Sequence, residues 1–277
     1  MFVFLLIVGI IGGLFCILAI FGLICYPFSI YCSKKEEKNP FEKKKVVFVF
    51  DDKSPKNADG VNGYLEAVGE TKPFCSFYCF WKRLFDIVIS FFALIILSPV
   101  FLIISILIFF NDPGPVIFVQ KRVGKNKRFF KLHKFRSMKM STPHDTPTHM
   151  LEDPNRYITR VGKFLRSHSL DELPQIWDIF IGNMSIIGPR PALWNQDLLI
   201  SERDKYGANS IKPGLTGWAQ INGRDELSID RKAELDGYYM NNYGLPLDIK
   251  CFFGSIHVFH KDDSVIEGSK KDKNDDK

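Results

Sequence analysis

The first 33 residues of the chain contain no charged side chain, although charged residues make up 25% of the whole sequence. A secretory signal peptide would have a positive charge before its apolar core, a shorter core and a small-residue cleavage site, and none of these is clear here. The apolar block from Met1 to Tyr26 exceeds the roughly 20 residues that cross a bilayer. We expect residues 1–33 to be a transmembrane anchor, with a signal peptide as the alternative.

Positive charge is missing before this apolar block and begins directly after it, at Lys34, Lys35 and Lys38. Positively charged flanks of a membrane span stay in the cytoplasm. The N-terminus is therefore expected outside, and the chain that follows the anchor is expected to begin on the cytoplasmic face of the membrane.

Cysteine is too sparse and too poorly spaced for a zinc site or a disulfide framework. Of the six cysteines, three lie in or at the edge of the apolar N-terminal run, and Cys75 and Cys79 have no Cys or His partner at metal-ligand spacing. Free thiols are the expectation. The net charge of +6 is too small to indicate nucleic acid, and anionic lipid or phosphorylated substrates fit it equally well.

Two segments lack the apolar pattern of a folded domain. Residues 34–79 are rich in Lys, Asp, Asn and Gly and contain one β-like run, Val46–Phe50, so we interpret them as a linker with one candidate strand. Residues 263–277 form a charged tail with nothing to bury, and we expect this tail to be disordered.

A second uncharged apolar segment runs from Ile87 to Phe110 and is interrupted near its middle by Ser98 and Pro99. Its length would allow a span, but a proline there removes a backbone hydrogen bond and disfavours a straight helix. Basic residues on both sides place both ends in the cytoplasm. We predict a re-entrant helix over residues 84–110, with the Ser98 hydroxyl satisfying a carbonyl freed at the break. The basic flanks are Lys82 and Arg83 before the segment, and Lys121, Arg122, Lys125, Lys127 and Arg128 after it.

The chain beyond Pro115 is expected to form a soluble domain that begins with a hairpin. Two β-rich runs flank Gly124-Lys125-Asn126, which is typical of a hairpin turn. The basic residues of this hairpin follow the membrane segment directly and suit a surface that rests on anionic headgroups. An ordinary solvated basic face is the alternative.

Two adjacent carboxylates, Asp171 and Glu172, stand in the stretch SLDELPQ. Apolar residues recur at helical spacing after them, and Gly182-Asn183 is a natural stop, so we expect the stretch to open an amphipathic helix. Ser169 would then be the N-cap and Glu172 the third helical residue of a capping box, while Asp171 complements the helix dipole. This explanation needs no catalysis.

The segments after this helix favour a second interpretation. They read GNMSIIGPRPAL and KPGLTGWAQINGRDEL, are rich in Gly and Pro, and carry the well-spaced cations Arg190, Lys212 and Arg224. Arginine offers a planar fork that suits phosphate, and a helix N-terminus is itself an anion site. A carboxylate tolerates a phosphate beside it when it attacks the phosphorus, or when a divalent cation such as Mg²⁺ lies between them.

Eight motifs occur in order between Phe80 and Asp262. They are KRLFD, the Ser98-Pro99 break, DPGPVIFVQKRVG, KFRSM, LRSHSLDELPQ, GNMSIIGPRP, KPGLTGWAQINGR and ELDGYYMNNYGLPLDIK. In this order the motifs resemble those of the bacterial sugar transferases, the monotopic polyprenyl-phosphate phosphoglycosyl transferases. The resemblance predicts one transferase domain over residues 80–262 and leaves out the anchor, the linker and the tail.

The resemblance implies an enzyme of the bacterial inner membrane that moves a phosphosugar from a UDP-sugar onto undecaprenyl phosphate and releases UMP. This reaction would be the first membrane step of capsule, O-antigen or exopolysaccharide assembly. The resemblance also implies that Asp171 forms a covalent aspartyl-phosphosugar intermediate and that Glu172 helps to hold Mg²⁺. The substrate-binding positions that it implies are Pro189, Arg190, Pro191, Arg224, Lys134 and Arg166.

The expected fold class is α+β, helix-rich and membrane-associated, with a small β element. Asp225 departs from the family pattern, in which an amide is expected after Arg224. A catalytically weak member that acts as a membrane scaffold in glycan assembly is the alternative function. A membrane-anchored acyltransferase or phosphatase is less well supported, because Cys75 and Cys79 lie outside the soluble domain. No motif here encodes the sugar, the glycan pathway or the oligomeric state.

Overall fold

The computed structural model describes residues 38–71, 74, 76–142, 154–223 and 226–259. The anchor expected over residues 1–33 and the tail expected over residues 263–277 lie outside the described residues, as do Arg224 and Asp225.

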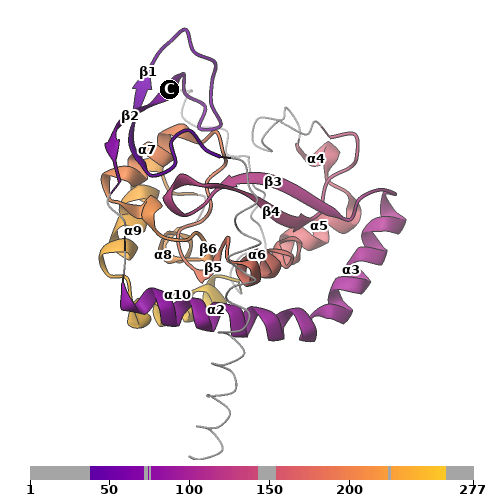
Figure 1. The fold of residues 1–277 in the computed structure, drawn as a ribbon. Coiled ribbons are helices and arrows are strands. Elements are labelled where there is room, and N and C mark those ends of the chain that lie inside the picture. The colour runs from indigo at the N-terminus through magenta and orange to yellow at the C-terminus, as the bar shows by residue number, and fades with distance from the viewer. Residues whose placement is uncertain (1–37, 72–73, 75, 143–153, 224–225, 260–277) are drawn as a thin grey trace, which may run out of the picture.

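The described chain contains both helices and short strands, which confirms the expected mixture of the two (Figure 1). The strands form two antiparallel pairs and one parallel pair, which are β1 (Lys44–Phe50) with β2 (Gly63–Glu70), β3 (Ile117–Val123) with β4 (Phe129–Phe135), and β5 (Ser185–Ile187) with β6 (Gly214–Thr216). The α-helices are α2 (Phe77–Ile96), α3 (Ser98–Asn111), α4 (Pro154–Tyr157), α5 (Arg160–Ser167), α6 (Gln175–Ile181), α7 (Asp197–Lys205), α8 (Trp218–Ile221), α9 (Ile229–Asn241) and α10 (Leu245–Phe259).

The second apolar segment forms α2 and α3, which are bent by 59° where they meet. Within the described ranges no single helix is long and apolar enough to cross a membrane, whereas this bent pair meets both criteria together. The Ser98 hydroxyl donates to the Ile95 carbonyl at 2.8 Å, as predicted for the break. α2 begins at Phe77, before the expected residue 84, because the Ser76 hydroxyl caps it by accepting the Tyr78 N–H.

Lys82 and Arg83 are buried, although their charge suggests an exposed membrane flank. Lys82 bonds to the Asp248 carboxylate of α10. Arg83 donates to the carbonyls of Ile179 (2.6 Å) and Phe180 (2.7 Å), which lie in the last turn of α6. The two cations therefore hold α2 against the domain, and they are not free charges of a cytoplasmic flank.

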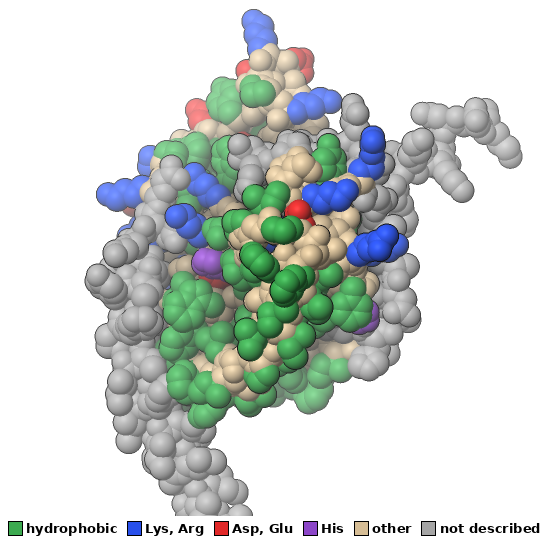
Figure 2. Space-filling view, turned by 90° about the vertical axis from the view of Figure 1, so that its right-hand side faces the viewer, with side chains coloured by type: hydrophobic (Ala, Val, Ile, Leu, Met, Phe, Trp, Pro, Cys, Tyr) green, Lys and Arg blue, Asp and Glu red, His purple; other side chains and the backbone are tan. Residues whose placement is uncertain are grey.

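The opposite side of α2 and α3 is apolar and exposed. Figure 2 shows the α3 side of the molecule, where hydrophobic side chains cover a broad area below several Lys and Arg side chains. An apolar surface of this extent is typical of a membrane or protein contact. Its exposed residues on the two helices are Phe77, Phe80, Phe85, Ile89, Phe92, Ile95, Ile96, Val100, Leu102, Ile103, Ile106, Leu107, Phe109 and Phe110.

The hairpin predicted around Gly124-Lys125-Asn126 is confirmed, since β3 and β4 pair along their whole length. Asn126 and Lys127 close the turn with positive φ angles of 56° and 63°. Buried Phe130 and Leu132 pack β4 against the end of α6. This packing brings β4 beside the turn that carries the acidic pair.

The segment interpreted as a linker contains a two-stranded sheet. Its first strand, β1, includes the run expected at Val46–Phe50. The second strand, β2, was not expected, and Gly63 is the one residue of β2 that is buried. The sheet packs on α7 through Val46, which is 1% exposed. Residues 44–70 are therefore folded against the domain that follows them.

The start of α7 brings two carboxylates together. Asp59, in the loop between β1 and β2, accepts the backbone N–H groups of Leu198 (2.8 Å) and Leu199 (3.3 Å). Burial, with the Asp59 carboxylate nearby, raises the pKa of Asp197 to about 6 from 3.8. The folded state thus binds this proton more tightly than the unfolded chain, so stability is lost as the pH rises from about 4 through about 6 and Asp197 ionises.

We expect Asp197→Asn to raise the Tm by about 2 °C near neutral pH, a small gain because this site is partly solvent-screened. The gain should shrink as the pH falls and vanish below about pH 4, where the wild-type carboxyl is protonated in both states. Thermal unfolding of the purified full-length protein across this pH range measures the difference. Asp230→Asn, at an exposed position in the first turn of α9, is the control. A gain in Tm that does not change with pH would contradict the raised pKa of Asp197.

Candidate active site

The acidic pair lies in a tight turn that precedes an α-helix. Ser169 has left-handed backbone angles (φ 52°, ψ 21°), Leu170–Glu172 form one 3₁₀ turn, and α6 begins only at Gln175. The Ser169 side chain makes no capping hydrogen bond, and the Ser169 backbone N–H donates to the Arg166 carbonyl at 3.1 Å. The capping-box prediction is therefore wrong. Positive φ at a serine stores strain of the order of 1 kcal/mol, as is typical of functional turns.

Glu172 does not cap the turn because two cations hold its carboxylate. Its Oε1 atom accepts hydrogen bonds from Lys134 Nζ at 2.9 Å and from Arg190 Nη2 at 3.0 Å. Burial would raise the pKa of Glu172, but the charges of Arg190 and Lys134 outweigh burial and hold that pKa well below its usual range. Glu172 is therefore ionised at neutral pH, although its side chain is only 13% exposed.

Three separate parts of the chain build this cluster. Lys134 lies on β4, Glu172 precedes α6, and Arg190 follows β5 between two prolines that restrict its backbone. All three residues belong to the motifs from which the site was predicted, and Lys134 and Arg190 both lie within hydrogen-bond distance of Glu172.

The two Gly-Pro segments lie side by side through the β5–β6 pair. The Pro189 carbonyl accepts the Gly214 N–H at 2.9 Å, and the Gly188 N–H donates to Thr216 at 2.8 Å. A Cβ atom on Gly214 would lie 2.1 Å from the Gly188 nitrogen, so only glycine allows this approach. The glycines therefore fix the backbone from which Arg190 projects.

Asp171 is buried, with 9% of its surface exposed, and lies in the same 3₁₀ turn as Glu172. Arg166 is in the last turn of α5 and adjoins this turn through its carbonyl bond to Ser169. Lys212, which follows Arg190 in the Gly-Pro-rich segments, lies near α2, where burial and the charge of Arg83 lower its pKa to about 7.

Arg122 also belongs to this region, although its position in the sequence suggests only a charge that flanks the membrane segment. Its Nη1 atom donates to the Pro191 carbonyl at 2.9 Å. The next residue, Val123, donates its N–H to the Ala192 carbonyl, also at 2.9 Å. β3 thus holds the Pro-Arg-Pro segment. The sequence did indicate a role for Arg122 in the transferase domain, because Arg122 belongs to the motif DPGPVIFVQKRVG.

A metal at this site would need ligands from the substrate. Within the described ranges no three His, Cys, Asp or Glu side chains are placed to hold a metal ion, and Cys79 and Cys251 are free thiols, as expected. Asp171 and ionised Glu172 are adjacent, and both protein cations bond to the same Glu172 oxygen. Mg²⁺ is commonly bound by one or two carboxylates together with substrate phosphates and water. The donor set fits an ion of that kind.

Ionised carboxylates, cations from separate segments and close-packed glycine loops are typical of enzymes that act on phosphorylated substrates. The chain belongs to the bacterial sugar transferase family, whose model matches residues 77–262. The family predicted from the eight motifs is thereby confirmed.

Curated relatives differ in length. The chain is 38% identical over 169 residues to "Uncharacterized sugar transferase EpsL" of Bacillus subtilis, covering 61% of this chain and 82% of that protein. It is 38% identical over 190 residues to "UDP-N-acetylgalactosamine-undecaprenyl-phosphate N-acetylgalactosaminephosphotransferase" of Aeromonas hydrophila, covering 65% of this chain and 44% of that protein. It is 40% identical over 182 residues to "UDP-glucose:undecaprenyl-phosphate glucose-1-phosphate transferase" of Escherichia coli, covering 63% of this chain and 39% of that protein. The chain thus spans less than half the length of these last two relatives.

Proposed function

We propose that this protein transfers a phosphosugar from a UDP-sugar to undecaprenyl phosphate, releasing UMP, as the first membrane step of surface-glycan assembly. The observation that carries the proposal is the Glu172 carboxylate, held ionised by Lys134 and Arg190 in the turn that contains Asp171. The names of the Aeromonas hydrophila and Escherichia coli relatives support the same reaction class.

The proposed transfer has two displacements at phosphorus. In the first, an Asp171 carboxylate oxygen attacks the phosphorus that bears the sugar, and the bond to the bridging oxygen breaks, so UMP leaves with the electron pair. In the second, a phosphate oxygen of undecaprenyl phosphate attacks the same phosphorus. The bond to Asp171 breaks, which restores the carboxylate and yields the diphosphate-linked sugar. Arg190 offers the fork that binds and orients the nucleotide phosphate.

Mg²⁺ would be held by Glu172, with Asp171 beside it, and by substrate phosphate oxygens. When bound, it supplies charge that offsets the repulsion between the substrate phosphates and the attacking carboxylate. Lys134 and Arg190 keep Glu172 ionised and fix its orientation before substrate binds.

The sugar has to be measured, because relatives at 35–40% identity are named for N-acetylgalactosamine, glucose and galactose. The test is UMP release by the purified protein from a panel of UDP-sugars, with undecaprenyl phosphate and Mg²⁺ present. One or a few UDP-sugars should support turnover. A folded protein that releases UMP from none of them would contradict the proposal and favour the scaffold alternative.

We further propose that the α2–α3 pair is re-entrant, with both of its ends on the cytoplasmic face. The bend at Ser98-Pro99 and the exposed apolar side of the pair support this topology. Single cysteines at Lys53 and Lys131, exposed positions on either side of the pair, test it in a background without the native cysteines. Both positions should react with an impermeant thiol reagent only after the cells are lysed. Labelling of position 131 in intact cells would show a complete crossing.

A further inference from the structure

Residues 39–70 precede the family match at residues 77–262, yet they contact the domain beside the Pro-Arg-Pro segment. We propose that these residues, called the N-terminal clamp below, hold the loop that carries Arg190 and thereby set the affinity for the nucleotide sugar. The inference rests on the proposed function and adds positioning residues that lie outside the shared domain.

Val46 makes the apolar contact of the clamp. It is 1% exposed and lies in one buried cluster with Val123, Ala192, Leu199 and Ile200. Ala192 lies two residues after Arg190, and its carbonyl bonds to the Val123 N–H at 2.9 Å. Val46 therefore fills the space behind the backbone that presents Arg190. A cavity there would let this backbone shift.

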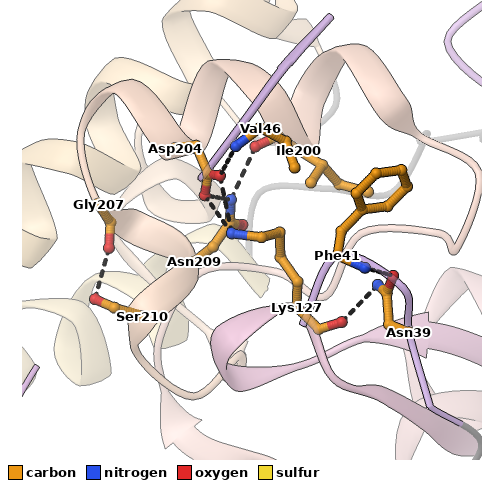
Figure 3. Close-up of polar contacts among 9 residues, drawn as sticks. All are labelled: Asn39, Phe41, Val46, Lys127, Ile200, Asp204, Gly207, Asn209 and Ser210. Carbon is orange, nitrogen blue, oxygen red and sulfur yellow. Dashed lines mark hydrogen bonds and ion pairs between the residues drawn. The ribbon is translucent and has the colours of Figure 1, made fainter. Parts of the chain in front are cut away.

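A buried ion pair joins the clamp to two other elements (Figure 3). Lys127, fully buried in the β3–β4 turn, places Nζ at 2.9 Å and 2.8 Å from the two carboxylate oxygens of Asp204 on α7. Asp204 also accepts the Val46 N–H at 2.9 Å and the Asn209 amide at 2.6 Å. A buried charge needs its hydrogen bonds, so the Val46 N–H forms part of what keeps this pair in place.

The clamp also binds the carbonyls of the β3–β4 turn. Asn39 donates its amide to the Lys127 carbonyl at 2.6 Å, and the Lys43 N–H donates to Asn126 at 3.0 Å (the Asn39 bond is drawn in Figure 3). Asn126 and Lys127 have positive φ angles, which persist only where surrounding contacts hold them. The clamp thereby fixes the hairpin whose strands contact both Pro191 and Glu172.

Further contacts of the clamp lie on the C-terminal side of the Pro-Arg-Pro segment. The Ala58 N–H donates to the Asn195 carbonyl at 3.0 Å. Asp59 accepts the N–H groups of Leu198 and Leu199, where α7 has no side-chain cap of its own. The clamp therefore supports the loop from β3 on one side and from α7 on the other.

Loss of the clamp's contacts is expected to weaken binding of the UDP-sugar more than it slows the chemical step. Arg190 Nη2 lies 3.0 Å from Glu172 Oε1, and a displacement of about 1 Å at the Arg190 backbone would take this pair beyond hydrogen-bond distance. The Asp171 turn packs against α5 and β4, and Lys134, which bonds to Glu172, stands at the end of β4 opposite to the turn that the clamp binds. Loss of clamp contacts should thus raise KM for the UDP-sugar while kcat changes little.

The first test compares Val46→Ala with Val47→Ala in the full-length enzyme. Val47 is the adjacent position on the opposite face of β1 and is 39% exposed, so it receives the same substitution without the buried contact. Val46→Ala should raise KM for the UDP-sugar, and the Kd of UDP measured by calorimetry, by about 5-fold with kcat within about 2-fold. Val47→Ala should leave all three within about 2-fold. A Val46→Ala protein with a lower Tm but unchanged KM and Kd would overturn the inference.

The second test uses a less buried position and a conservative rescue. Asp59→Ala removes the cap of α7 and should raise KM by about 3-fold, whereas Asp59→Asn keeps an acceptor oxygen and should restore the wild-type value. Equal KM values for Asp59→Ala and wild type would overturn the inference even if Val46→Ala fails to fold. A wild-type protein that releases no UMP from any UDP-sugar contradicts the proposed function instead, so the two failures are distinguishable.

Discussion

Replacing Asp171 with Asn should lower UMP release by at least about 10³-fold, because the amide that replaces the carboxylate is a far weaker nucleophile toward phosphorus. The loss should fall on kcat. The UDP affinity should stay close to that of the wild type, since Glu172 keeps its bonds to Lys134 and Arg190. Asp197→Asn, the same substitution at the start of α7, is the matched control and should retain turnover.

A covalent adduct provides the direct readout of the same prediction. Wild-type enzyme incubated with its UDP-sugar and no lipid acceptor should carry a phosphosugar on the peptide that contains Asp171, as measured by mass spectrometry. Asp171→Asn should carry none. Turnover by the Asn variant within about 10-fold of the wild type, or an adduct on another peptide, would contradict the nucleophile assignment.

Glu172→Gln should lower turnover by about 10²-fold or more and should raise the Mg²⁺ concentration needed for half-maximal activity. Glutamine keeps the size of the side chain but removes the charge that holds a divalent ion. It also leaves Lys134 and Arg190 without their counter-charge at a site where the Glu172 side chain is 13% exposed. Both consequences follow from one lost charge, so a second variant is needed to separate them.

Lys134→Met is that variant, because it removes one cation and keeps the Glu172 carboxylate. Turnover should fall, while the Mg²⁺ concentration for half-maximal activity should stay close to the wild-type value. Titration of UMP release against Mg²⁺ measures both variants. An unchanged Mg²⁺ requirement in Glu172→Gln would contradict the ligand role and would leave Glu172 as a residue that orients Arg190.

Local sequence was sufficient for the features that depend on neighbouring residues. Pro99 cannot supply a backbone N–H, so the apolar segment breaks there, and Ser98 bonds to a carbonyl three residues earlier. Gly182 ends α6 with φ 94°, a conformation that glycine adopts readily. The hairpin turn at Gly124 followed in the same way. The ordered motifs also named Lys134, Glu172 and Arg190, because each stands in its own short, specific stretch.

Long-range contacts decided the features for which the local sequence pattern was misleading. The capping box at Ser169 failed because Glu172 pairs with cations 38 and 18 residues away, and a charged partner outcompetes a backbone N–H. Lys82 looked like a flanking charge because lysine is seldom buried, yet Asp248, 166 residues further on, neutralises it. The segment before α2 looked like a linker because its local pattern gives no sign of these contacts. In the structure its first strand buries Val46 against Ala192 and bonds to Asp204, and both residues are remote in sequence. Charge pairing and apolar burial depend on distance in space, and folding sets that distance.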